Sequence, residues 1–164
     1  MIDWTKLSTD PNDAATVKRI HDNLIKIRTV RRKEYSEWLL AEVEGKTVLD
    51  IGAIEHNLEY ARLPHWKHRK LTEHANKVVG VDILEEYAEV LNKEGFDIRV
   101  CDATSDTYLG EKFDVVILGD VIEHVENPVK LVEFAMRHLE DNGEAIIKTP
   151  NPYYTGSIKK NLRG

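Results

Sequence analysis

Apolar residues change their spacing along this chain, and the changes mark predicted helices and strands. Before residue 47 they recur at helical intervals, as in the series Val17, Ile20, Leu24 and Ile27, which predicts one long or two shorter helices. Short β-rich runs then appear at 47–51, 77–81, 97–101, 113–118 and 144–148. Most of these runs lack the alternation of a half-exposed strand, which is typical of parallel strands covered on both faces.

Helical segments separate the β-rich runs. An apolar stripe from Leu84 to Leu91 ends at Gly95, a residue type favoured just after a helix. Asn127-Pro128 predicts the cap and first residue of another helix, which we expect to end at Gly143. Its predicted inward side is Leu131, Val132, Ala135 and Leu139. Strands that alternate with helices predict right-handed crossovers and a doubly wound, mainly parallel α/β sheet of five strands.

Length and composition indicate one soluble domain. The chain has 164 residues, which suits a single core, so we expect a helical segment at 1–45 packed on an α/β domain at 46–164. A net charge of −6 argues against a nucleic-acid partner. The single cysteine, Cys101, fits a reducing compartment, and no apolar run is long enough to span a membrane. These features predict a cytoplasmic protein.

An acidic residue stands at the end of each of the first four predicted strands. These residues are Asp50, Asp82, Asp102 and Asp120. The ligand crevice of an open α/β sheet lies beyond the carboxyl ends of its strands, so all four are expected at one rim. A carboxylate after the second strand can accept hydrogen bonds from both ribose hydroxyls of a nucleoside, and one after the third can accept from the exocyclic amine of adenine.

The order and spacing of five motifs then carry a family resemblance. VLDIG, VVGVDI, IRVCDAT, FDVVILGDVIEHVENP and IIKTPNP follow one another between about residues 46 and 152. In this order they resemble a class I S-adenosylmethionine-dependent methyltransferase. The resemblance implies a Rossmann-like methyltransferase fold with strand order 3-2-1-4-5 and helices on both faces. It also implies S-adenosylmethionine as cofactor and S-adenosylhomocysteine as product.

The resemblance assigns roles to residues at the first two strand ends. Gly52, with Ala53 beside it, would approach the methionine part of the cofactor, and Asp50 would support the cofactor amine. Asp82 would hold the ribose, and Ile83 would pack on adenine.

The later strand ends receive roles in the same way. Asp102 and Ala103 would read the adenine edge, while Gly119 and Asp120 would line the methyl-donor side. Methyl transfer depends mainly on positioning of the donor and the acceptor. A hydroxyl acceptor also needs a general base, for which His124 is the first candidate and Asp120 the second.

Two stretches depart from the family pattern. Ile54 and His56 stand where later glycines of the first loop are usual. Asp82 follows Asp50 by 32 residues, a long interval that reflects an insertion at 61–74. Pro64 should end a helical turn there, and a second helix should begin near Trp66, as a lid over the cofactor or a cover for the sheet. The histidines His56, His65, His68 and His74 lack the spacing of a zinc site and favour polar packing roles.

The carboxyl end is the second departure. The chain stops soon after the fifth strand, without the antiparallel hairpin usual in the family, so that strand should be an edge. A helix at Thr155–Leu162 or a second subunit, in a homo-oligomer, could cover it, and Tyr153 and Tyr154 could do so or line an acceptor pocket. The acceptor itself, a small molecule or a glycan-, lipid- or carrier-linked group, is not readable.

Three other functions remain open at this point. A nicotinamide enzyme would carry G-x-G-x-x-G with an acid about 20 residues on, which fits poorly. A non-catalytic methyltransferase-like binding or assembly module would explain the depleted loop and short tail. Asp120, Glu123 and His124 are similar to the E-x-x-E-H of metal-assisted RNA 2′-O-methyltransferases, although the first residue there is glutamate.

Overall fold

The computed structural model describes residues 8, 10, 13–29 and 34–151. The chain divides into two compact units, Met1–Trp38 and Leu39–Gly164. The first contains α1 (Ala14–Thr29), which begins where the Asp13 carboxylate accepts a hydrogen bond from the Thr16 amide at 2.7 Å. A further helix, α2 (Tyr35–Val43), precedes the sheet, so two helices are present rather than one long one. The packing of residues 1–45 on the domain stays a prediction.

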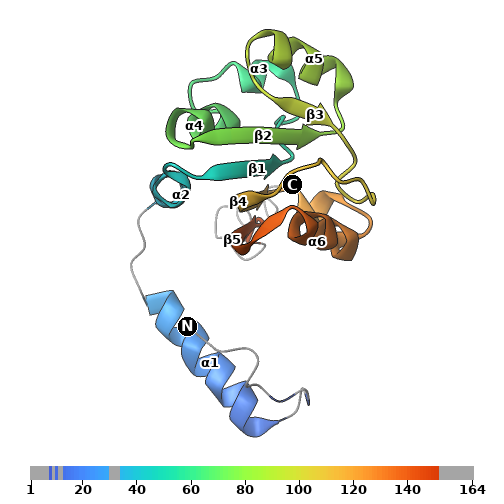
Figure 1. The fold of residues 1–164 in the computed structure, drawn as a ribbon. Coiled ribbons are helices and arrows are strands. Elements are labelled where there is room, and N and C mark those ends of the chain that lie inside the picture. The colour runs from blue at the N-terminus through green and yellow to red at the C-terminus, as the bar shows by residue number, and fades with distance from the viewer. Residues whose placement is uncertain (1–7, 9, 11–12, 30–33, 152–164) are drawn as a thin grey trace, which may run out of the picture. The chain divides into compact units, whose positions relative to one another are not determined.

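The second unit is built on a five-stranded sheet (Figure 1). Its strands are β1 (Thr47–Ile51), β2 (Lys77–Asp82), β3 (Ile98–Val100), β4 (Phe113–Gly119) and β5 (Leu139–Lys148). All neighbouring strands are parallel, and their order is β3-β2-β1-β4-β5. The predicted doubly wound sheet and its strand order are therefore confirmed. The order reverses between β1 and β4, which places a ligand crevice at their carboxyl ends.

Helices cover both faces of this sheet. They are α3 (Leu58–Ala61), α4 (Lys67–His74), α5 (Glu85–Lys93), the 3₁₀ turn η2 (Ile122–His124) and α6 (Pro128–Arg137). Alternate residues of a strand face opposite sides, and two apolar clusters result. One joins Leu49, Val79 and Val116 to α6, and the other joins Ile98 to α3 and α5 around the buried Trp66.

The helix after β4 is shorter than predicted. Asn127 caps α6 as expected, accepting from the Lys130 amide at 3.1 Å, but the helix ends at Arg137 instead of reaching Gly143. Leu139 already pairs with Phe113 as the first residue of β5, and the register then shifts before Val115 pairs with Glu144. The helical spacing of apolar residues continues in the sequence into this irregular strand. The prediction that Leu139 lies on the helix was therefore wrong.

The strand β5 stands at the end of the sheet order. The predicted covering helix at Thr155–Leu162, as well as Tyr153 and Tyr154, lies outside the described residues. Homo-oligomer formation stays a prediction. Among the helices that the structure describes, none is long and apolar enough to cross a membrane.

A buried histidine connects α6 to the loop before β4. The Nδ1 of His138 donates to the Phe134 carbonyl at 2.8 Å, and Nε2 accepts from the Leu109 amide at 2.9 Å. Both bonds require the neutral ring with its proton on Nδ1. Burial lowers the pKa of His138 below its usual 6.5, and the Arg137 and Arg99 charges act in the same direction, while the bond to Phe134 opposes them.

This histidine should make folding sensitive to acid. The unfolded ring takes up a proton near pH 6.5 and the folded ring only at lower pH, so its contribution to stability is lost as pH falls through 6.5. We expect the free-energy difference between wild type and His138→Gln, measured by urea unfolding, to shrink from pH 8 to pH 5. The exposed His65→Gln should show no such trend; a constant difference for His138→Gln would contradict this role.

Candidate functional site

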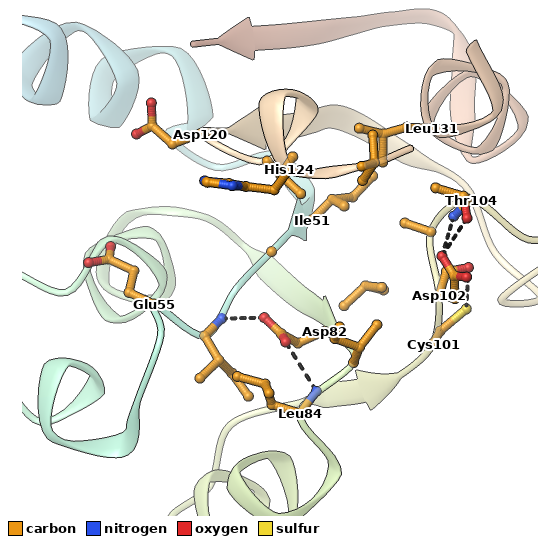
Figure 2. Close-up of a pocket in the computed structure, with 18 of the residues that line it drawn as sticks. Ile51, Glu55, Asp82, Leu84, Cys101, Asp102, Thr104, Asp120, His124 and Leu131 are labelled. Atoms are coloured by element: carbon orange, nitrogen blue, oxygen red, sulfur yellow. Dashed lines mark hydrogen bonds between the residues drawn. The ribbon is translucent and has the colours of Figure 1, made fainter. Parts of the chain in front are cut away.

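The carboxyl ends of the first four strands surround one cavity of about 760 Å³. Figure 2 shows residues from all four strand ends converging on it, with Asp120 and His124 across the cavity from Asp82. Of the predicted site residues, those that line it are Gly52, Asp82, Ile83, Asp102, Ala103, Gly119, Asp120 and His124. Asp50 and Ala53 do not line the cavity and lie behind its wall, both fully buried.

The carboxylate of Asp82 holds two main-chain amides at the end of β2 (Figure 2). Oδ2 accepts from Ile54 at 2.8 Å, and Oδ1 accepts from Leu84 at 3.2 Å. A carboxylate oxygen can accept two hydrogen bonds, so each oxygen retains capacity for a hydroxyl donor. The side chain is only 8% exposed, which leaves the cavity as its one open side. Asp82 therefore both closes the loop after β1 and presents a fixed acceptor to a ligand.

Next to Asp82 the cavity offers an apolar side chain, and the end of β3 adds a second acid. Ile83 is 70% exposed although its side chain is aliphatic, an arrangement suited to stacking on a flat ring. Asp102 Oδ1 accepts from the amide and the hydroxyl of Thr104, at 2.8 and 2.7 Å. These bonds lower the pKa of Asp102, so it is a carboxylate at neutral pH and can accept from an exocyclic amine.

The loop after β1 is held in shape by contacts that replace its missing glycines. The amides of Gly52 and Ala53 both donate to the Val81 carbonyl, at 2.9 and 3.2 Å. The indole Nε1 of Trp66 donates to the Ala53 carbonyl at 2.9 Å. Gly52 has a φ of 71°, and His56, where the family pattern has a glycine, has a φ of 55° in the same left-handed region. The insertion thus supports the loop from outside.

The acid at the end of β1 is engaged by that insertion. Asp50 is fully buried; Lys67 Nζ lies 2.7 Å from Oδ1, and His68 Nδ1 donates to Oδ2 at 3.0 Å. Burial alone would raise the pKa of Asp50, but the Lys67 charge and the His68 bond together lower it. Asp50 is therefore ionised and already paired with a cation, and Lys67 is the member of the group that lines the cavity.

The part of the cavity wall that follows β4 and the loop after β1 holds two histidines and an acid. His56 and His124 lie edge to face with ring centroids 6.5 Å apart, and both line the cavity. Asp120, with a φ of 55°, forms an ion pair with Lys148 at the end of β5. This ion pair engages one carboxylate oxygen of Asp120, and both predicted base candidates, His124 and Asp120, line the cavity.

The remaining histidines of the insertion serve packing and surface pairing. His68 is buried against Trp66, and His74 pairs with Glu44 at 3.0 Å. Within the described part of the chain, no three histidine, cysteine, aspartate or glutamate side chains gather as a metal site. Asp120 pairs with Lys148, and Glu123 accepts from the Thr149 hydroxyl at 3.3 Å.

Sequence reasoning missed Lys67 and the supports that Trp66 and His68 provide. The insertion was open to two interpretations, a lid or a cover for the sheet. The structure shows α4 packed on β2 with Trp66, His68 and Leu71 buried, while Lys67 alone from this helix reaches the cavity wall. Pro64 was a usable signal for these residues. It ends the preceding helical turn, so α4 starts just after it, with residues 66–68 beside the end of β1.

The cavity fits a nucleoside cofactor in its size and in the acceptors and apolar side chains that line it. Pockets for such ligands commonly enclose 300–1,000 Å³. An apolar rim at Ile83, spare acceptors on Asp82 and an ionised Asp102 match a base, a ribose and an exocyclic amine. The left-handed Gly52 leaves the crevice wall without a side chain where the β1 loop turns.

Similarity to known proteins agrees with this fold and this cavity. A family described as a methyltransferase domain matches residues 26–163. An uncharacterized protein of Methanocaldococcus jannaschii, MJ1123, is 35% identical over 44% of this chain and 35% of its own. The ubiquinone biosynthesis O-methyltransferase of Rickettsia felis is 31% identical over 50% of this chain and 46% of its own. The chain thus spans less than half the length of these relatives.

Solved structures share the fold at low identity. The sugar N-methyltransferase KedS8 of Streptoalloteichus has a TM-score of 0.56 at 20% identity, covering 79% of this chain and 53% of that one. The S-adenosylmethionine-bound amino pentose methyltransferase CalS10 of Micromonospora echinaspora has a TM-score of 0.58 at 12% identity, covering 80% and 56%. The predicted methyltransferase fold is confirmed, and CalS10 holds S-adenosylmethionine. This chain belongs to the methyltransferase-domain family.

Proposed function

We propose that this chain binds S-adenosylmethionine in the cavity at the carboxyl ends of β1 to β4 and transfers its methyl group to a small-molecule acceptor. The observation that carries the proposal is the cavity itself. It brings Asp82 and Asp102 from two strand ends to one side and His124 to the other, and Ile83 also lines it.

Each residue then has a binding task. The Asp82 carboxylate accepts from the ribose hydroxyls with the capacity that Ile54 and Leu84 leave on it. Ile83 packs on adenine, and Asp102 with Ala103 reads the adenine edge. Gly52 and Gly119 let the main chain approach the sulfonium end of the cofactor. Most of the rate comes from holding acceptor and donor in line with water excluded.

When bound, S-adenosylmethionine supplies an electrophilic methyl group. An acceptor hydroxyl or amine must lose a proton as it attacks, and an imidazole nitrogen of His124 is the group at the cavity wall that takes this proton. Asp120 flanks His124 and is the second candidate. The relatives are named for methylation at oxygen and at sugar nitrogen, so a panel of phenols, hydroxylated lipids, sugars and amino sugars covers the acceptor classes.

Calorimetric titration tests the cofactor site directly. We expect S-adenosylmethionine and S-adenosylhomocysteine to bind at micromolar concentrations and NAD not to bind. No binding to a folded protein, or preferential binding of NAD, would overturn the proposal and favour a non-catalytic module or a nicotinamide site.

The base can be tested once an acceptor from the panel supports turnover. With a hydroxyl acceptor, His124→Gln should lower kcat by about 10²–10⁴-fold, the usual contribution of a positioned base, while the affinity for S-adenosylhomocysteine stays unchanged. The matched control is His65→Gln, an exposed histidine that does not line the cavity. Equal kcat values for His124→Gln and wild type would remove His124 from the reaction.

A further inference from the structure

A lysine of the insertion places a positive charge at the cavity wall. Lys67 Nζ lies 2.7 Å from Asp50 Oδ1, and its side chain is only 18% exposed. A Cβ added to Gly119 would lie 3.0 Å from this nitrogen, so the ammonium sits against the end of β4 as well as the end of β1. These two strand ends flank the point where the strand order reverses.

The position of this ammonium is determined by buried neighbours. Lys67 is the first residue of α4; Trp66 before it is bonded to the Ala53 carbonyl, and His68 after it is bonded to Asp50. Trp66 and His68 are both buried. A lysine normally loses considerable rotamer entropy when it is fixed, but here the residues on both sides and the buried carboxylate already hold it. The ammonium is therefore pre-organised for a ligand.

Asp50 balances the Lys67 charge from behind the cavity wall. Both oxygens of Asp50 are engaged, by Lys67 and His68, and Asp50 is fully buried and absent from the cavity wall. An ammonium has three donors, and Asp50 occupies one of them. The group presented to a ligand here is consequently a cation that has donors to spare.

Resting on the proposed S-adenosylmethionine site, we infer that Lys67 binds the carboxylate of the cofactor's amino-acid end, with Asp50 and His68 as positioning residues behind it. An ammonium–carboxylate contact in a partly desolvated cavity is a charge-assisted hydrogen bond of the stronger kind. This assignment differs from the expected role of Asp50, whose carboxylate would have met the cofactor amine directly. The insertion thus supplies a recognition group as well as support for the loop.

Three nucleoside thioethers separate the contributions to binding. S-adenosylhomocysteine has both the carboxylate and the amine, its decarboxylated analogue keeps only the amine, and 5′-methylthioadenosine has neither. In wild type we expect S-adenosylhomocysteine to bind at least tenfold more tightly than its decarboxylated analogue. Lys67→Met should abolish that preference by weakening S-adenosylhomocysteine about tenfold or more, while 5′-methylthioadenosine affinity stays the same. Calorimetry measures all three.

Controls distinguish this contact from a change in the fold. Lys67→Met leaves Asp50 buried without the cation that neutralises it, so the double variant Asp50→Asn, Lys67→Met is measured beside it, since it removes both charges. Lys70→Met, on the same helix but paired with Glu73 and not lining the cavity, should keep the wild-type preference. Retained 5′-methylthioadenosine binding reports an intact nucleoside site in every variant.

The outcomes are separable from those of the proposed function. If none of the three thioethers binds wild type, the cofactor site itself is wrong. If all bind, but Lys67→Met and the double variant keep the preference for the carboxylate, or weaken 5′-methylthioadenosine equally, the role of Lys67 is overturned while the cofactor site stands.

Discussion

Asp82→Ala is expected to weaken S-adenosylhomocysteine binding by about a hundredfold or more. Two hydrogen bonds to a charged acceptor contribute about 1.5–3 kcal/mol each, and the ribose would lose both. The structure adds a second effect, because Asp82 also accepts from the Ile54 and Leu84 amides. Leaving these donors unpaired should lower the free energy of unfolding by about 1–3 kcal/mol. Calorimetry and urea unfolding measure the two effects.

Asp114→Ala is the matched control for Asp82→Ala. Asp114 likewise holds a main-chain amide, accepting from the amide and hydroxyl of Thr47, both at 2.8 Å, but it does not line the cavity. Its replacement should lower stability without changing affinity. From the sequence alone, Asp82→Ala is predicted to lose cofactor binding and to leave the fold intact. Unchanged affinity in Asp82→Ala, at a temperature where the variant is folded, would contradict the assignment of the ribose site.

Asp50→Ala is expected to cause the largest loss of stability, about 3–5 kcal/mol, which is typical when one partner of a buried ion pair is removed. Asp50 and His68 are both fully buried, and no other hydrogen-bond partner for the His68 ring is present among the described residues. The variant therefore removes the hydrogen-bond partner of the His68 ring and the carboxylate that pairs with Lys67. Urea unfolding at pH 7 measures the change, and we expect S-adenosylhomocysteine affinity to fall as well because Lys67 loses its anchor.

A surface pair that involves the last residue of α4 provides the comparison for Asp50. Glu44 pairs with His74 at 3.0 Å, but its side chain is 68% exposed, so Glu44→Ala should cost less than about 1 kcal/mol. Similar losses in Asp50→Ala and Glu44→Ala would mean that burial does not strengthen the Asp50 group, and the proposed pre-organisation of Lys67 would lose its physical basis.

The strand arrangement was predictable because local and global preferences agree. Largely apolar runs without alternation at β1, β2 and β4 are stable only where both faces are covered, so they indicated a parallel sheet before any contact was known. The Asn127 cap and the Pro64 break are similarly local signals, set by side-chain bonding to the next turn and by proline's missing amide. The end of α6 was not predictable, because its helical period continues into the irregular start of β5.

The sequence by itself determined which residues stand at the strand ends, and hence that Asp82, Asp102, Gly119 and Asp120 meet at one rim, since parallel strands bring their carboxyl ends together. Only the tertiary structure decided what those residues bond to. Asp50 and Lys67 are 17 positions apart, and no periodicity relates them. Their pairing depends on how α4 packs over β1 and β2, a long-range contact that converts the acid at the first strand end into the support for a cation at the cavity wall.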